Sequence, residues 1–84
     1  MKKIVIYSKD NCVYCDKAVK LAQQFQFGDC GLKDVIVKKL DVHFTMEKLM
    51  ELFPTARTFP QIVVDDENIG GYTELESLFK IRYD

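Results

Sequence analysis

Two cysteines, Cys12 and Cys15, stand two residues apart in the segment SKDNCVYCDKA, between an apolar run and a stretch with helical spacing. A pair with this spacing can bind a metal, form a structural disulfide or act as a reactive dithiol. Backbone N–H groups at the start of a helix carry partial positive charge, which favours a thiolate over a thiol. Cys12 gains most from this effect, and one helical turn brings Cys15 within reach of a disulfide formed at Cys12. The spacing therefore suits a nucleophile, Cys12, with a resolving thiol, Cys15.

Two other uses of the pair stay open on these residues alone. Cys12, Cys15, Cys30 and His43 make up a three-cysteine, one-histidine set of the kind that binds structural zinc, although the last two lack the close spacing of a zinc knuckle. The two cysteines can also be small buried hydrophobes, a use that suits Cys15 better than Cys12. Cys30 itself is more typical of a loop or packing cysteine than of a catalytic one.

The segments around the pair predict a strand, a helix and a second strand. Residues 3–8, KIVIYS, are β-branched and aromatic and predict a strand buried on both faces. A helix is expected to begin at or just after Cys12 and to end at GDCG, residues 28–31. Residues 35–42, VIVKKLDV, predict a strand parallel to the first. The helix has an apolar stripe at Ala18, Leu21, Ala22 and Phe25.

The second half of the chain predicts a helix, a hairpin and a final helix. Thr45 is a plausible cap for a helix that Pro54 ends, and its expected apolar stripe is Met46, Leu49, Met50 and Phe53. Residues 61–71, QIVVDDENIGG, predict two short antiparallel strands joined by an acidic turn. Thr73 and Glu76 have the spacing of a capping box, ahead of an apolar face formed by Leu75, Leu78 and Phe79. The predicted order is βαβαββα.

Length and composition favour one domain spanning residues 1–84. The chain has 84 residues, 48% of them hydrophobic, which is enough for one core. Twelve basic and thirteen acidic side chains give a formal net charge of −1, which argues against nucleic-acid and membrane partners. The apolar run at the N-terminus is shorter than an export signal needs, and three cysteines do not make a disulfide scaffold, so we expect a reducing, cytoplasmic location.

The segments YSKDNCVYC and ARTFPQIVVDDENIGGYTEL, together with the element order, resemble a glutaredoxin of the dithiol kind. The resemblance covers nearly the whole chain, with Val13 where the family usually has proline between its cysteines. It implies a monomer with a thioredoxin-like α/β fold, in which a four-stranded mixed sheet is covered by three helices.

The resemblance also implies a glutathione site. In the family, the proline that matches Pro60 is cis and faces the cysteines, and the start of the last helix binds the γ-glutamyl end of glutathione. Glu47 falls where many members have a polar or basic residue, so we expect it to disfavour the glycine carboxylate unless Lys48 or Arg57 compensates. The implied glutathione-binding residues are Lys9, Tyr14, Arg57, Thr58, Phe59, Pro60, Gly71, Tyr72, Thr73 and Glu74.

The implied activity is that of a glutathione-disulfide oxidoreductase. It reduces protein disulfides, with ribonucleotide reductase as a candidate, and protein–glutathione mixed disulfides through Cys12 and Cys15. It has no tightly bound cofactor and uses glutathione as co-substrate. Two alternatives stay open: a thioredoxin-type reductant served by a flavoprotein reductase, and a module that binds an iron–sulfur cluster with glutathione, against which Val13 and Tyr14 argue.

Overall fold

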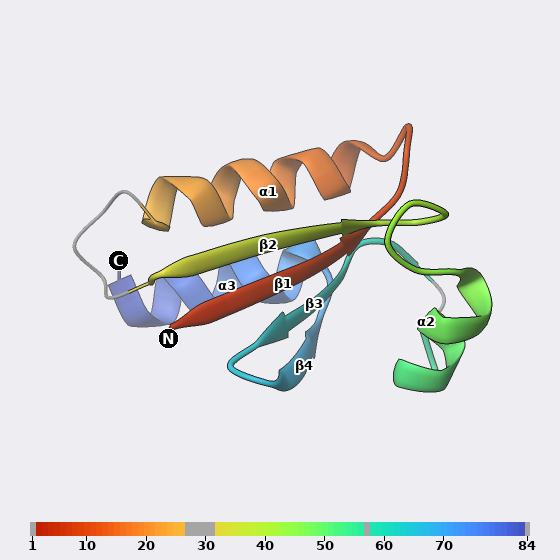
Figure 1. The fold of residues 1–84 in the computed structure, drawn as a ribbon. Coiled ribbons are helices and arrows are strands. Elements are labelled where there is room, and N and C mark those ends of the chain that lie inside the picture. The colour runs from red at the N-terminus through yellow and green to blue at the C-terminus, as the bar shows by residue number, and fades with distance from the viewer. Residues whose placement is uncertain (1, 27–31, 57, 84) are drawn as a thin grey trace.

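The computed structural model of the chain describes residues 2–26, 32–56 and 58–83. These residues form strands and helices in the predicted order βαβαββα (Figure 1). The elements are β1 Lys3–Ser8, α1 Val13–Gln26, β2 Asp34–Lys39, α2 Met46–Leu52, β3 Gln61–Val64, β4 Glu67–Gly70 and α3 Tyr72–Tyr83. Within the described part of the chain, no helix combines the length and apolarity that crossing a membrane requires.

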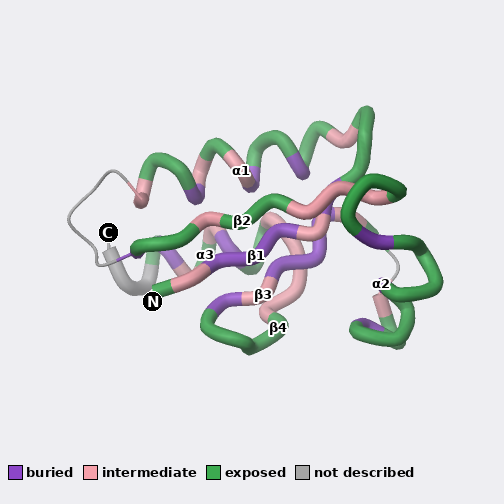
Figure 2. The backbone as a smooth tube through the Cα atoms, viewed as in Figure 1, coloured by how far each residue is buried: buried purple, intermediate pink, exposed green. Residues whose placement is uncertain are grey.

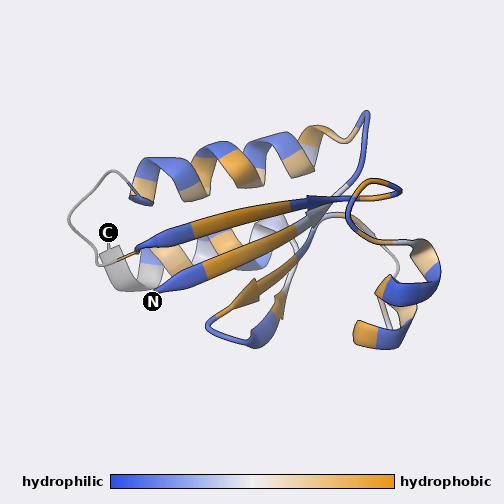
Figure 3. Cartoon of the chain, in the orientation of Figure 1, coloured by the Kyte–Doolittle hydropathy of each residue, from blue (hydrophilic) through white to orange (hydrophobic). Residues whose placement is uncertain are grey.

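The four described strands form one mixed sheet with the order β2-β1-β3-β4. β1 pairs with β2 in parallel and with β3 in antiparallel orientation, so Tyr7 lies between Lys38 and Gln61. β3 and β4 form the predicted antiparallel hairpin. Hydrophobic residues occupy the middle of β1 and β2 and hydrophilic residues their ends (Figure 3). The predicted mixed α/β sheet is therefore confirmed.

Helices α1 and α3 contact each other and cover the sheet, α1 over β1 and β2 and α3 over β3 and β4. Buried positions follow β1, β3 and the inward side of α1 (Figure 2). Burial removes these side chains from water, which is the main stabilising term of such a fold. The principal cluster of buried side chains consists of Ile4, Ile6, Ala18, Ala22, Leu32, Ile62, Val64, Leu75 and Phe79.

A second, smaller cluster lies near α2, beyond the end of the sheet where β1 ends (Figure 1). Its buried members are Phe44, Leu49 and Phe53, and Tyr7 and Phe59 pack against them. The Tyr7 ring meets the rings of Phe44 and Phe53 edge-on, with 5.2 Å between centroids in both pairs. This aromatic cluster joins β1 to the segment that precedes β3.

The second strand is shorter than predicted because the chain turns at Lys39. The N–H groups of Val42 and His43 both donate to the Lys39 carbonyl, at 3.1 and 2.8 Å, and Asp41 has a left-handed φ of 64°. The Nδ1 atom of His43 accepts the N–H of Lys39 at 2.9 Å. The strand pattern of residues 40–42 is thus overridden by a tight turn that His43 closes.

The start of α2 is as predicted, and of its predicted apolar stripe Leu49 and Phe53 are buried but the two methionines are not. Thr45 caps the helix, because its Oγ1 accepts the N–H of Lys48 at 3.2 Å. Leu49 is buried, whereas Met46 and Met50 are 46% and 40% exposed. The helix has seven residues and lies beyond the sheet, so only one side of it meets the aromatic cluster.

Helix α3 begins earlier than predicted, and the predicted capping box of Thr73 and Glu76 does not form. The first intrahelical bond runs from the N–H of Leu75 to the carbonyl of Gly71 at 3.1 Å, which makes Gly71 the N-cap. Glu76 instead accepts the hydroxyl of Tyr72 at 3.1 Å. The N–H groups of Tyr72, Thr73 and Glu74 are therefore those of the first turn, which an α-helix leaves without partners.

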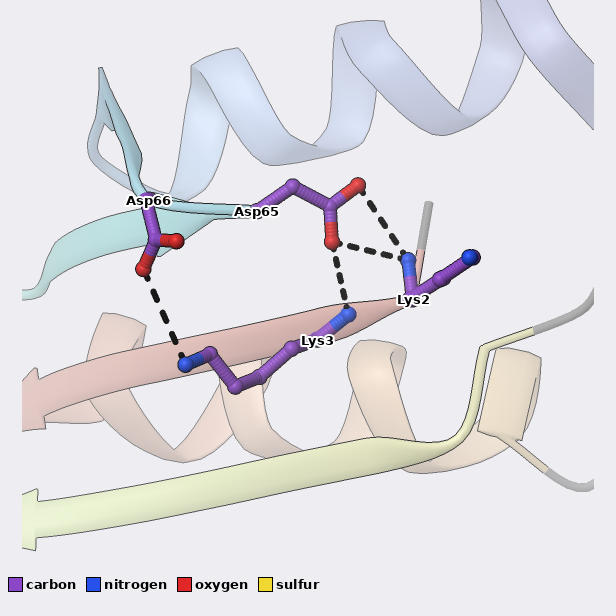
Figure 4. Close-up of polar contacts among 4 residues, drawn as sticks. All are labelled: Lys2, Lys3, Asp65 and Asp66. Carbon is purple, nitrogen blue, oxygen red and sulfur yellow. Dashed lines mark hydrogen bonds and ion pairs between the residues drawn. The ribbon is translucent and has the colours of Figure 1, made fainter.

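The acidic turn between β3 and β4 holds the hairpin against the start of β1. Asp65 and Asp66 have φ values of 49° and 69°, the left-handed conformation that a two-residue hairpin turn favours. Figure 4 shows the Asp65 carboxylate accepting the N–H groups of Lys2 and Lys3, both at 2.9 Å. Asp66 faces the Lys3 ammonium at 3.7 Å. The backbone hydrogen bonds from Lys2, and then from Lys3, lower the pKa of Asp65 below its ordinary value of 3.8.

We predict that Asp65→Asn destabilises the protein at neutral pH and not in strong acid. A lowered pKa in the folded state means that the ionised carboxylate stabilises the fold above 3.8. That contribution is lost as the pH falls through the folded-state pKa. Urea unfolding measures the free energy of unfolding of the natural protein and of Asp65→Asn from neutral to strongly acid pH. The difference between the two should shrink as the pH falls.

Asp66→Asn is the matched control, because its carboxylate makes an exposed ion pair of little worth. Equal and pH-independent effects of the two substitutions would contradict the role of Asp65.

Candidate active site

The Cys12 sulfur lies at the N-terminus of α1. Asp16 donates its N–H to the Cys12 carbonyl at 3.2 Å, so Cys12 is the N-cap residue. The N–H of Cys15 points at the Cys12 Sγ, 3.2 Å away, where a capping oxygen normally accepts. This geometry lets the helix start stabilise negative charge on the Cys12 sulfur.

The two cysteines form a disulfide, with their Cα atoms 5.2 Å apart. Cys15 is only 1% exposed, whereas Cys12 is half-buried. Between them Val13 and Tyr14 are 66% and 55% exposed. Solvent and substrates therefore reach Cys12 more readily than Cys15, which fits the predicted division into nucleophile and resolving thiol.

Charged side chains surround the loop that leads into Cys12. Asp10 forms an ion pair with Lys39 on β2. The ammonium of Lys9 lies over the ring of Phe59, 5.4 Å from its centroid. Asp10 is the nearest carboxylate on the N-terminal side of the cysteines, and the ammonium of Lys39 offsets its negative charge.

A groove of about 480 Å³ lies between the start of α1, the segment before β3 and the start of α3. Eight of the ten residues predicted from the resemblance line it: Tyr14, Thr58, Phe59, Pro60, Gly71, Tyr72, Thr73 and Glu74. Lys9 does not line the groove, but it contacts Phe59, which does. Arg57 and Cys30 lie outside the described residues.

The groove is narrow where Pro60 meets Gly71. The Phe59–Pro60 peptide bond is cis, as predicted. The side-chain amide of Gln61 donates a hydrogen bond to the backbone carbonyl of Thr58 at 2.7 Å and holds this turn. A Cβ atom on Gly71 would lie 3.3 Å from the Pro60 carbonyl, so glycine allows the two walls to approach.

Two tyrosines line the groove between α1 and α3. The rings of Tyr14 and Tyr72 lie 5.7 Å apart, and the Lys17 ammonium is 5.1 Å from the Tyr14 ring centroid. The hydrogen bond that Tyr72 donates to Glu76 raises the pKa of Tyr72, so its hydroxyl stays protonated. Sequence reasoning missed Lys17, because no motif marks a lysine that only the helical turn brings over Tyr14.

The other residues weighed from sequence lie apart from the groove. Glu47 is exposed on α2 and does not line the groove, and its expected conflict with a glycine carboxylate stays a prediction. The Nδ1 atom of His43 is engaged by the backbone of Lys39. The described residues contain no group of three side chains arranged to hold a metal ion, although the zinc set that the sequence left open also includes Cys30, which lies outside them.

A second hollow of about 660 Å³ was not predicted. Cys15 lines it together with residues from the end of β1 and the loop after it, from α1, from β2 and from the turn after β2, among them Lys9, Lys39 and His43. These positions are far apart in the sequence, and only the parallel pairing of β1 and β2 brings them together. Cys15 thus borders a space that is separate from the groove.

Residues 4–69 match the glutaredoxin family model. The chain belongs to the glutaredoxin family. It is 32% identical over 84 residues to the glutaredoxin of Haemophilus influenzae, covering 95% of this chain and 93% of that protein. It is 31% identical over 87 residues to glutaredoxin 1 of Escherichia coli, covering 95% of both chains. The solved structure of oxidised Escherichia coli glutaredoxin matches with a TM-score of 0.80 at 28% identity, over 98% of both chains.

Membership of the glutaredoxin family and the Cys12–Cys15 pair identify the chain as a thiol–disulfide oxidoreductase with a thioredoxin-like fold. The glutaredoxin fold predicted from sequence is confirmed. The structure brings the described members of the predicted site to one end of the molecule, and their role in binding glutathione stays a proposal.

We predict that, in the reduced protein, iodoacetamide modifies Cys12 and spares Cys15. Cys15 is buried, and the helix start should hold the Cys12 pKa below that of an ordinary thiol. The rate of alkylation against pH, with the modified residue identified by peptide mass, measures both effects. A midpoint at or above that of a free cysteine would remove the helix start as the activating feature.

Proposed function

We propose that the protein is a glutathione-dependent reductant of protein disulfides and of protein–glutathione mixed disulfides. The observation that carries this proposal is the groove, whose lining includes eight of the nine described residues expected there from the family resemblance. The groove lies beside the Cys12–Cys15 pair, because Tyr14 between the cysteines forms part of its wall.

The start of α3 offers a receptor for the γ-glutamyl end of glutathione. The N–H groups of Thr73 and Glu74 belong to the first turn and can donate hydrogen bonds to a carboxylate, which the helix dipole also favours. The Glu74 side chain folds back over Gly70, since a Cβ atom there would lie 3.0 Å from its carboxylate. A carboxylate at this place can pair with the α-ammonium of the same γ-glutamyl group.

The middle of the tripeptide would lie along Phe59. The cis bond before Pro60 turns the backbone at the groove wall. Backbone N–H and C=O groups at such a turn can pair with an extended peptide in the manner of an added strand. In this position the cysteine of glutathione faces the Cys12 end of the groove.

Reduction of a protein disulfide proceeds by two thiol–disulfide exchanges, after which glutathione regenerates the dithiol. The Cys12 thiolate attacks one sulfur of the substrate disulfide, forms a mixed disulfide with it and releases the other sulfur as a thiol after uptake of a proton. With a protein substrate, Cys15 loses its proton and attacks the Cys12 sulfur, which forms the Cys12–Cys15 disulfide and releases the second thiol. Two glutathione molecules then reduce this disulfide and become glutathione disulfide.

The exposed pair Val13 and Tyr14 gives protein substrates an apolar surface beside Cys12. The family resemblance extends the proposal to ribonucleotide reductase as a protein substrate. It also implies no tightly bound cofactor, a monomeric chain and a reducing compartment such as the cytoplasm, where glutathione keeps the pair in its dithiol form.

The two reducing systems distinguish this proposal from a thioredoxin-type reductant. With NADPH, either glutathione and glutathione reductase or thioredoxin reductase alone is supplied, and reduction of a protein disulfide is followed. We expect turnover with glutathione only. Cys15→Ser should keep reduction of glutathione mixed disulfides, while Cys12→Ser should lose it. Turnover by thioredoxin reductase without glutathione would overturn the proposal.

We predict that Thr73→Pro weakens glutathione binding without unfolding α3. Proline is tolerated in the first helical turn and removes one N–H that would meet the γ-glutamyl carboxylate. A hydrogen bond to a charged group contributes about 1.5–3 kcal/mol. Its loss should raise the KM for a glutathione mixed disulfide by roughly tenfold or more.

Thr73→Ala is the matched control, because it removes the side chain and keeps the N–H. Thermal unfolding of both variants checks the helix. A KM that rises equally in both would assign the effect to the threonine side chain and not to the helix start.

A further inference from the structure

Phe59 occupies the place at which the family resemblance has valine, and its ring is held from one side by the aromatic cluster near α2. The ring of Phe44 stacks against it, with 6.5 Å between centroids and 24° between planes. Phe44 is buried and in turn meets Tyr7 edge-on. Phe59 therefore contacts the aromatic cluster and also lines the groove.

The ammonium of Lys9 rests on the same ring, 5.4 Å from the centroid. Among the residues that the structure describes, no carboxylate lies within ion-pair distance of Lys9, and its neighbour Asp10 pairs with Lys39. An ammonium over an aromatic face is attracted by the ring quadrupole, by about 0.5–1 kcal/mol at an exposed site. The aromatic ring is thus the contact that orients Lys9 and leaves its charge available.

The part of the groove wall that the structure describes has no positively charged side chain. Its described lining includes the carboxylate of Glu74 and no lysine or arginine. Glutathione carries two carboxylates at opposite ends, and the start of α3 can receive only one of them. A cation beside the groove, at the end away from α3, is what the second carboxylate requires.

We propose that Phe59 is a positioning residue whose ring holds the Lys9 ammonium where it receives the glycine carboxylate of glutathione. This inference rests on the proposed glutathione-dependent function. A lysine side chain has about 2 kcal/mol of rotamer entropy to lose when it is fixed, so a ring that orients it beforehand lowers the cost of binding. Valine at this position would have no face for the ammonium.

Lys17 provides a matched comparison. Its ammonium also lies over an aromatic residue of the groove, Tyr14, at 5.1 Å. Tyr14 contacts Tyr72 at the start of α3, so Lys17 belongs to the γ-glutamyl end of the groove. Removing Lys17 should therefore leave recognition of the glycine carboxylate unchanged.

The test is a double-mutant cycle with Lys9→Met, Phe59→Leu and both together, measured as the KM and kcat for a glutathione mixed disulfide. We expect Phe59→Leu to raise KM about two- to fivefold with little change in kcat, the range that a cation–π contact supplies. Lys9→Met should raise KM at least as much, and the double variant no further than Lys9→Met alone. Phe59→Tyr, which keeps an aromatic face, should restore the KM of the natural protein.

A second substrate separates positioning from a packing defect. In the mixed disulfide of glutathione glycine ethyl ester the glycine carboxylate is absent, so Lys9→Met and Phe59→Leu should both have little effect on its KM. Lys17→Met should affect the two substrates equally. Additive effects in the cycle, failure of Phe59→Tyr to restore KM, or an undiminished effect with the ester would overturn the inference while leaving the proposed function intact. Absence of glutathione turnover in the natural protein would overturn both.

Discussion

The Cys12 sulfur stands in the place of a capping oxygen at the start of α1, and the rest of the active end is arranged around that contact. β1 delivers the chain from the core at Ser8, and Asn11 turns it through a left-handed φ of 55° so that Cys12 becomes the N-cap. The N–H of Cys15 then meets the sulfur at 3.2 Å. The same helical turn buries Cys15, so activation of one thiol and protection of the other come from a single piece of backbone geometry.

The sheet brings the other parts of the site to the same end. β3 is antiparallel to β1, so its first residues lie beside the last residues of β1, with Gln61 opposite Tyr7. The hairpin then returns the chain along β4, which places Gly71 beside Pro60 and starts α3 at the groove. The carboxylate of Asp65 ties the far end of this hairpin to the backbone of Lys2 and Lys3. Alignment of the groove walls therefore depends on hydrogen bonds at both ends of the hairpin.

The sequence allowed prediction of the fold, because periodicity and motifs report on local structure. The family resemblance, and not periodicity, named the residues that the structure places around the groove. β1 and the start of α1 were predicted to within a residue, and the hairpin was placed correctly. The failures have local causes that a pattern does not contain. Residues 40–42 read as strand, but His43 closes a turn on Lys39. Thr73 and Glu76 have the residue types and spacing of a capping box, but Gly71 is the N-cap of the helix.

Individual side-chain contacts between distant segments were not predicted, since no spacing in the chain relates Lys9 to Phe59 or Asp10 to Lys39. The hollow that Cys15 lines depends likewise on the pairing of β1 with β2.

The position of Phe59 between the groove and the aromatic cluster has a consequence for the evolution of the family. Protein interiors tolerate substitutions best when the total volume is conserved. A smaller residue at this place removes one side of the space that Phe44 fills, and a larger one displaces Phe44 from Tyr7. Across related sequences, the residue types at positions 44 and 59 are therefore expected to vary together. This covariation would link the residue that lines the groove to the residue that packs the loop before α2.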